Sequence, residues 1–303
     1  MLIKFYNHSR GSALVQILVG LAVGCAVILG AEKAYDIVNR EYINQIAQIS
    51  SSSEEQYASE VIRSITDQAG YAGCGVDRMW QDNVYSGFGA SIFSEPVIYG
   101  IDDSQTDTIK KLNIDNEGSG KYLAGSDVLI VKSSGLSGQE TLYKQLDKGE
   151  QQLKLMTNLN LKEDNIVLLH DCMRFTAVQI KGVSENQNNE KVVTLYNQLA
   201  NEIPYGAVVS VYQKSIIYVG EAPRTVKGKQ VYSLYEKNEY GVRNELVPNI
   251  SSLKVEYLSP NGEFVSAAKI SNWLMVKEIN VRLTTSQNNT VDEAHIAIKR
   301  NIP

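Results

Sequence analysis

His170, Asp171 and Cys172 are consecutive and combine the residue types of a nucleophilic triad. A cysteine nucleophile needs a base that takes its proton and a third group that orients the base. Outside the polar N-terminal stretch the only other histidine is His295, and the chain has no Gly-x-Ser-x-Gly motif. The triplet therefore favours a structural role. We expect a chain that is not an enzyme, with a hydrolase as the weakest alternative.

Two loops gather carboxylates of the kind that coordinate calcium: Asp102, Asp103 and Asp107 in one, Asp115 and Glu117 in the other. Calcium takes about six to eight oxygen ligands. Neither loop follows the Asp-x-[Asp/Asn]-x-[Asp/Asn]-Gly pattern with a glutamate at the twelfth position. We therefore expect solvated loops and no cofactor, with calcium as a minor candidate.

The composition does not predict a nucleic-acid partner. The 303 residues carry a formal net charge of -5 and a pI of about 5.4, and no basic run stands out after residue 11. Proteins that bind phosphate backbones display clustered lysines and arginines. The 17 tyrosines lie in segments of alternating polarity, which favours exposed β-sheet surface over a catalytic cleft.

The N-terminus combines a short basic leader with an uncharged apolar run. Lys4, His8 and Arg10 precede Gly11, and no charged residue follows until after Ala31. A helix of about 20 apolar residues crosses a bilayer, and the basic side stays in the cytoplasm. The run therefore predicts one span at about 13–31, with the rest of the chain outside the cytoplasm. A removed signal peptide is the minority alternative.

Cys74 and Cys172 lie in the part that the charge rule places outside the cytoplasm. That compartment is oxidising, which favours one disulfide between them. The two positions are 98 residues apart. Closing a loop of that size stabilises the fold by about 4–5 kcal/mol in the chain-entropy model. The alternative is a reactive or metal-binding thiol.

Apolar residues at helical spacing continue beyond the apolar run. They are Ile37, Val38, Ile46, Ile49, Tyr57, Val61, Ile65 and Ala69, with Tyr42, Ile43, Ala58 and Ile62 widening the stripe. The simplest prediction is one helix from about Ala13 to Ala69. At 1.5 Å per residue its length would be roughly 85 Å, far more than a membrane span. Gly70 and Gly73 are expected to end it.

Strand patterns dominate from Ser126 onwards. The strand-like segments are 127–131, 175–180, 191–196, 207–219, 230–235, 253–258 and 274–283. Turn signals separate them, among them Pro204-Tyr205-Gly206 and Pro260-Asn261-Gly262. Because no helical segments alternate with these strands, the pattern predicts an antiparallel meander.

A leader that ends in glycine, a helix longer than its span and an antiparallel sheet together resemble a type IV prepilin. The later part of the chain is similar to the minor-pilin family called PilW. The segments that carry this resemblance are 67–74 (Asp-Gln-Ala-Gly-Tyr-Ala-Gly-Cys), 125–131, 171–172, 216–219, 233–235, 247–257 and 276–281. Their order matches the family over nearly the whole chain.

The resemblance implies an α+β, type IV pilin-like fold. It implies a leader at 1–11, a long N-terminal helix at 12–70 with a transmembrane first third, and an antiparallel β-sheet head at 71–303 packed on that helix. A prepilin peptidase would cut between Gly11 and Ser12, and the new amine at Ser12 would be methylated. The family pattern also fits the disulfide between Cys74 and Cys172.

Gln16 occupies the position where typical pilins carry a glutamate that pairs with the terminal amine of a neighbouring subunit. A neutral amide hydrogen-bonds across helices but does not neutralise an ammonium. A subunit that never docks below another needs no carboxylate there, so Gln16 indicates a place at or near the fibre tip. The alternative is that Gln16 simply bonds sideways. Gly20 and Gly24 form a small-xxx-small pattern that permits close helix packing, although glycine is also common in membrane helices.

These features predict a minor pilin that helps to prime assembly of a type IV pilus and is incorporated at or near its tip. The expected partners are other minor and major pilins through the N-terminal helix, the prepilin peptidase, the inner membrane and a tip adhesin. The expected location is the bacterial inner membrane, single-pass with the head in the periplasm, and then the pilus surface. The alternatives are a minor pseudopilin of a type II secretion system and a secreted β-domain binder.

Overall fold

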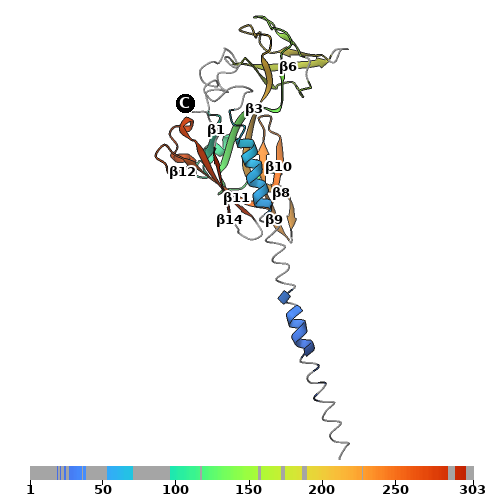
Figure 1. Cartoon of the computed structure of the whole chain (residues 1–303), viewed down its shortest axis with the longest axis vertical. Coiled ribbons are helices and arrows are strands. Elements are labelled where there is room, and N and C mark those ends of the chain that lie inside the picture. Colours follow the sequence, from blue (N-terminus) through green and yellow to red (C-terminus); the bar gives the residue numbers. More distant parts are fainter. Residues whose placement is uncertain are drawn as a thin grey trace, which may run out of the picture. The chain divides into compact units, whose positions relative to one another are not determined.

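The computed structural model describes most of the chain beyond residue 52 and part of the chain before it (Figure 1). The described residues are 19, 21, 24, 27–35, 37–38, 53–70, 96–116, 118–155, 158–171, 175–185, 190–226, 228–285 and 291–297. The side chains at 135–137, 175, 291–295 and 297 lie outside this description. The chain divides into two units, Met1–Ser50 and Ser51–Pro303, which are treated separately below.

The described residues of the first unit are all helical and all exposed. Their longest uninterrupted run, residues 27–35, has nine residues and includes Glu32 and Lys33. A bilayer crossing takes about 20 predominantly apolar residues. Within the described residues no helix is long and apolar enough to span a membrane. This finding contradicts the predicted single-pass location in the bacterial inner membrane.

The predicted fold class, a long N-terminal helix packed on a β-sheet head, is also wrong. Within its described part the chain is mostly antiparallel β-sheet, and the helix that packs on the sheets covers only residues 53–66. The physical reason lies in the core. Only Ala58, Ile62 and Ile65 of its buried residues come from this helix, and strands supply most of the others.

The helix at 53–66 buries a narrow stripe. Ala58 and Ile62 are fully buried and Ile65 is nearly so, at the spacing of four and three that places side chains on one helix face. Tyr57, which the sequence pattern assigned to the packed stripe, is 60% exposed. The pattern therefore located this helix and included Ala58, Ile62 and Ile65, but it also placed the exposed Tyr57 on the same stripe.

The helix ends at residue 66, a few residues before the predicted end at Ala69, and Gly70 closes the turn that follows it. Gly73, the second glycine expected to end the helix, lies outside the described residues. The φ of Gly70, 72°, is left-handed, which glycine adopts without strain. Its amide donates to the carbonyl of Lys132 at 2.9 Å, so the end of the helical segment is tied to a central strand.

Among the described residues, ten strands form one large antiparallel sheet. They are β1 (Ile98–Ile101), β2 (Lys121–Tyr122), β3 (Val128–Thr141), β4 (Gln152–Leu155), β5 (Ile166–His170), β6 (Phe175–Glu185), β7 (Lys191–Leu195), β8 (Val208–Val226), β9 (Lys229–Lys237) and β10 (Arg243–Pro248). The main order is β1-β3-β8-β5-β6-β7-β4; β2 and β9 also pair with β8, and β10 pairs with β9.

Four strands form a second antiparallel sheet in the order β12-β11-β13-β14. They are β11 (Ile250–Leu258), β12 (Phe264–Ser266), β13 (Glu278–Thr285) and β14 (Val291–Ala297). Short helices lie between strands: α4 (Thr106–Lys111), η1 (Ala267–Lys269) and η2 (Trp273–Met275). The strand predictions at 127–131, 175–180, 191–196, 207–219, 230–235 and 253–258 are confirmed, whereas the one at 274–283 begins too early, inside η2.

β8 is the longest of the described strands, and two different strands pair with successive parts of one of its edges. β3 pairs with residues 208–217 of β8 on its first edge. On the opposite edge β5 pairs with Val208–Val211, and β9 pairs from Ile216 onwards. The strand order therefore contains a crossover that a simple meander does not have.

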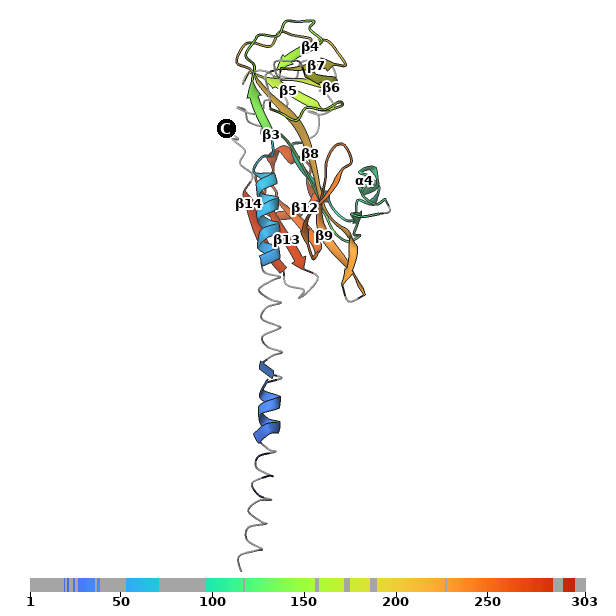
Figure 2. The same ribbon diagram turned by 90° about the vertical axis from the view of Figure 1, so that its right-hand side faces the viewer.

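A second lobe, residues 142–211, extends from the ends of β3 and β8. It contains β4 to β7 and has its own apolar core (Figure 2). This core includes Leu153, Leu169, Ile180, Leu195 and Val209. Because β3 and β8 run into the lobe, it continues the large sheet rather than forming a separate sheet.

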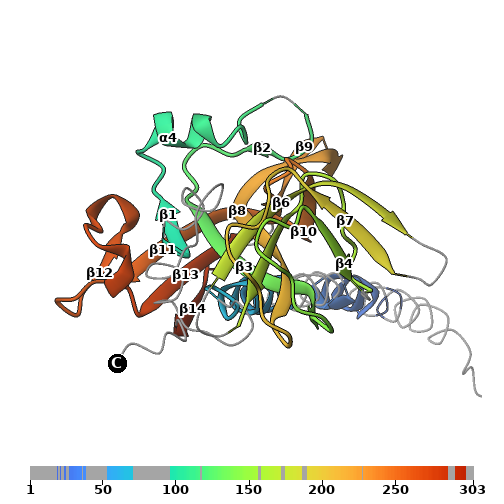
Figure 3. The ribbon, with the colours of Figure 1, turned by 90° about the horizontal axis from the view of Figure 1, so that it is seen from above.

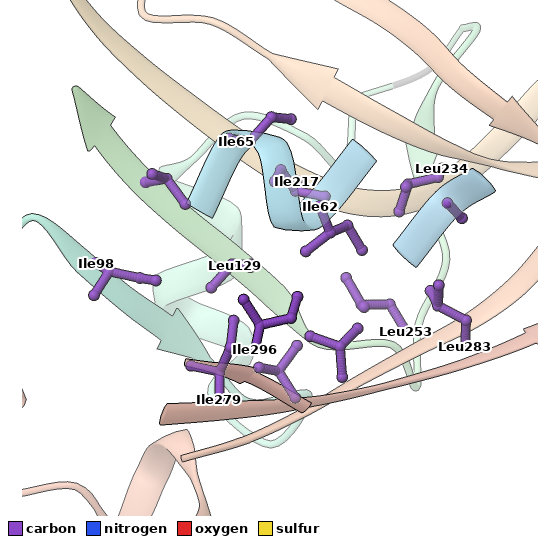
Figure 4. Packing of buried hydrophobic residues seen from close by; sticks show 14 of the residues in the cluster. Ile62, Ile65, Ile98, Leu129, Ile217, Leu234, Leu253, Ile279, Leu283 and Ile296 are labelled. Atoms are coloured by element: carbon purple, nitrogen blue, oxygen red, sulfur yellow. The ribbon is translucent and has the colours of Figure 1, made fainter. Parts of the chain in front are cut away.

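The main core lies where the helix at 53–66, the large sheet and the four-stranded sheet meet. The two sheets lie side by side in Figure 3 and share this core. Figure 4 shows Ile62 of the helix among Ile217 and Leu234 of the large sheet and Leu253 and Leu283 of the small one. A third cluster, on the α4 side of the large sheet, contains Ile109, Ile130 and Tyr218.

Ile62→Ala is expected to lower the free energy of unfolding by about 2–5 kcal/mol, because it leaves a cavity between the helix and both sheets. Tyr57→Ala, on the exposed side of the same helix, is the matched control and is expected to change it by less than about 0.5 kcal/mol. Urea denaturation of both variants checks this. Equal effects would contradict the assigned packing face.

Candidate functional site

The described helical residues of the first unit present an exposed apolar surface. We call it the N-terminal apolar surface and define it as Val19, Leu21, Val27, Ile28, Leu29, Ile37 and Val38, all between 57% and 69% exposed. Tyr35 beside them is 71% exposed. Large apolar side chains exposed at this density indicate an interaction site, because their exposure to water is unfavourable.

Gly24 and Gly30, helical residues of the first unit, leave room for a close partner. A Cβ added to Gly24 or Gly30 would meet no atom within 4 Å. Backbones approach one another most closely at small residues. The surface is therefore suited to contact with an apolar helix rather than to chemistry.

The structure places only one of the residues predicted for processing, assembly or disulfide formation. Gly24 is helical and exposed. Gly11, Ser12, Gln16, Gly20, Cys74 and Cys172 lie outside the described residues. The cleavage position, the role of Gln16 and the disulfide therefore stay predictions.

His170 is the last residue of β5 and is 1% exposed. Burial lowers its pKa to about 4, although the neighbouring Asp171 acts in the opposite direction. His295 belongs to β14 of the four-stranded sheet, where it pairs in register with Asn280 of β13. Buried and neutral, His170 has the environment of a structural residue, and the two histidines belong to different sheets.

The carboxylates of residues 102–107 form contacts within the protein, one long-range and two local. The Asp103 carboxylate lies 2.9 Å from the Lys254 ammonium, and Asp102 accepts a hydrogen bond from the Ser104 amide at 2.8 Å. Asp107 forms a surface pair with Lys110. Within the described part of the chain, no group of three or more histidine, cysteine, aspartate or glutamate side chains is arranged to hold a metal ion.

Asp127 joins the two sheets, a role that sequence reasoning missed. Its carboxylate accepts hydrogen bonds from the Val255 amide at 2.9 Å and from Lys254 at 3.2 Å. Its amide donates to the Leu253 carbonyl at 2.8 Å. Ser126 makes a second link, because its hydroxyl accepts from the Leu253 amide at 2.9 Å.

The contacts of Lys254 with Asp103 and Asp127 favour its charged form. Burial opposes ionisation of Lys254, but the hydrogen bond to Asp103 and the attraction to Asp127 outweigh it, so the pKa of Lys254 is raised. The sequence signal was the run Ser126-Asp127 directly before an apolar strand. A buried aspartate at that place needs partners, but the sequence does not say that residues 253–255 supply them.

Comparison with protein-family models, with curated proteins and with solved structures finds no match for this chain.

Folding stability is expected to fall between pH 6.5 and 4 through His170. The unfolded chain takes up a proton near pH 6.5, whereas the folded chain resists protonation until about pH 4. The loss approaches about 3 kcal/mol at the acid end of this window. Urea denaturation at pH 7, 5.5 and 4.5 measures it.

The comparison variant is His170→Gln, which carries no titrating ring. Its free energy of unfolding should depend less steeply on pH in this window than that of the unmodified chain. Identical pH slopes in both proteins would show that His170 does not carry the effect.

Proposed function

We propose that this chain is a minor pilin, which helps to prime assembly of a type IV pilus and is incorporated at or near its tip. The observation that carries the proposal is the N-terminal apolar surface. Its described residues are helical, apolar and more than half exposed. Subunits that polymerise through packed helices cover such surfaces with one another.

The second unit of the chain has apolar cores of its own. Its helix at 53–66 is fixed on the strands by Ala58, Ile62 and Ile65, and the rest of the unit is folded around its own cores. The apolar surface is therefore not needed to complete the described β-rich core. It remains available for partners, which in this proposal are other minor and major pilins.

The proposed position of the subunit near the pilus tip rests on the sequence alone. Gln16 cannot neutralise the terminal amine of a neighbouring subunit, so a subunit that never docks below another is favoured. In the proposal, a prepilin peptidase cuts between Gly11 and Ser12, and the β-rich unit contacts a tip adhesin.

Ile28→Glu is expected to prevent incorporation, because it places a charge in the middle of the N-terminal apolar surface. In the bacterium that encodes the chain, a deletion strain should show at least several-fold fewer surface pili, and Ile28→Glu should restore few of them. The chain should be absent from sheared pili of that strain. Electron microscopy and immunoblotting measure both.

Tyr57→Glu is the matched control, since it changes an exposed aromatic residue of the folded unit to the same charged residue. It should restore pilus number to that of the unmodified strain. An unchanged pilus number in the deletion strain, together with no chain in sheared pili, would contradict the proposal.

A further inference from the structure

A polar cleft of about 440 Å³ opens beside the middle of β8. In the described part of the chain, β5 pairs with this edge of β8 only up to Val211, and β9 pairs with it only from Ile216. Residues 212–215 therefore face a gap in the strand ladder. The cleft occupies this gap, and its volume lies in the range of about 300–1,000 Å³ that is usual for small-molecule sites.

Three segments line the cleft. β8 forms one side, the loop before β5 a second, and the β9–β10 turn with its flanking residues the third, while Ile65 of the helix adds an apolar contact. The lining residues are Ile65, Asn160, Lys162, Asn165, Val211, Gln213, Lys214, Ser215, Glu236, Asn238, Glu239, Tyr240 and Asn244. Side-chain amides are the commonest group among them.

Several polar groups of the cleft are held in place by the protein itself. Asn165 is 7% exposed, and its amide oxygen accepts from the Lys162 backbone amide at 2.9 Å. The Glu239 carboxylate accepts from the Lys214 backbone amide at 3.0 Å. The Ser215 hydroxyl donates to Glu236. Such fixed groups bind a ligand with little loss of side-chain entropy.

The charges of the lining balance. The charged lining residues are two lysines, Lys162 and Lys214, and two glutamates, Glu236 and Glu239. A phosphate or another polyanion would meet two carboxylates here, which is unfavourable. Amide side chains both donate and accept hydrogen bonds, so they match a ligand whose hydroxyl groups also do both.

Tyr240 supplies a partly exposed ring. It is 43% exposed and lines the cleft. A tyrosine hydroxyl is neutral at pH 7 even with its ordinary pKa, and burial, followed by the nearby Glu239, raises the pKa of Tyr240 further, to about 12. An aromatic ring with a neutral hydroxyl offers an apolar face and a polar tip, the combination that an amphipathic ligand requires.

A neighbouring hollow of about 630 Å³ shares Lys214, Asn238, Glu239 and Tyr240 and adds three lysines. Two of these lysines are used by the protein. The Lys237 ammonium donates to the Leu112 carbonyl at 2.6 Å and to the Asn113 carbonyl at 3.1 Å, and Lys132 is 1% exposed. The hollow therefore adds less positive charge than its composition indicates.

We propose that the cleft beside residues 212–215 of β8 is a binding site for a neutral oligosaccharide. The sugar hydroxyls would bond to the amides of Asn160 and Asn244, and the C–H face of one sugar ring would lie on Tyr240. This binding does not depend on the pilin assignment, because it uses only residues of the second unit.

The test is a binding experiment with the purified full-length chain. An array of neutral di- to tetrasaccharides, with sialylated and sulfated counterparts, is screened first, and the best neutral sugar is then titrated by calorimetry. At least one neutral sugar should bind, and its acidic counterpart should bind more weakly. The absence of any neutral binder, or a preference for acidic sugars, would overturn the proposal.

Variants locate the binding. Asn160→Ala and Asn244→Ala change exposed cleft residues, and each should weaken binding of the selected sugar several-fold. Tyr240→Ala should weaken it at least tenfold, and Tyr240→Phe less. Tyr205→Ala changes a tyrosine that is 74% exposed and does not line the cleft, so its affinity should equal that of the unmodified chain. Unchanged affinity in all the cleft variants would show that the sugar binds elsewhere and would overturn the proposal.

Discussion

The continuity of β8 is the constraint on which the rest of the second unit depends. Its side chains enter three apolar clusters of the described residues: Val209 and Val211 in the 142–211 lobe, Ile217 and Val219 in the main core, and Tyr218 on the α4 side. A strand alternates its side chains between two faces, so one strand can serve two cores at once. A break in β8 would remove one of the two strands, β3 and β8, that connect the lobe to the main core.

The same strand explains where the polar cleft lies. β5 belongs to the 142–211 lobe and β9 to the main body, and both use one edge of β8 without meeting. Polar side chains fill the interval because backbone groups there need partners, as the Lys214 amide finds in Glu239. The β-rich unit thus carries a candidate recognition site of its own, apart from the apolar surface through which we propose that the chain polymerises.

The sequence predicted local strands well and long-range relations poorly. Short apolar runs and alternating apolar residues located β3, β6, β8 and β11, because burial of a strand's faces imposes these patterns locally. Helical periodicity predicted the helix less accurately. It placed the exposed Tyr57 on the apolar stripe, and it predicted a helix from 13 to 69 of which the described residues show only parts. The bonds of Asp127 to residues 253–255 join positions more than 120 apart, and no local pattern encodes such a pairing.

The most direct test of the pilin assignment is the mass of the mature N-terminus, measured on chain purified from the bacterium that encodes it. The account predicts a first residue of Ser12, because a prepilin peptidase would cut after Gly11 and retain the apolar segment. A chain that begins at Met1, or at Glu32 or later as after removal of a signal peptide, would contradict it.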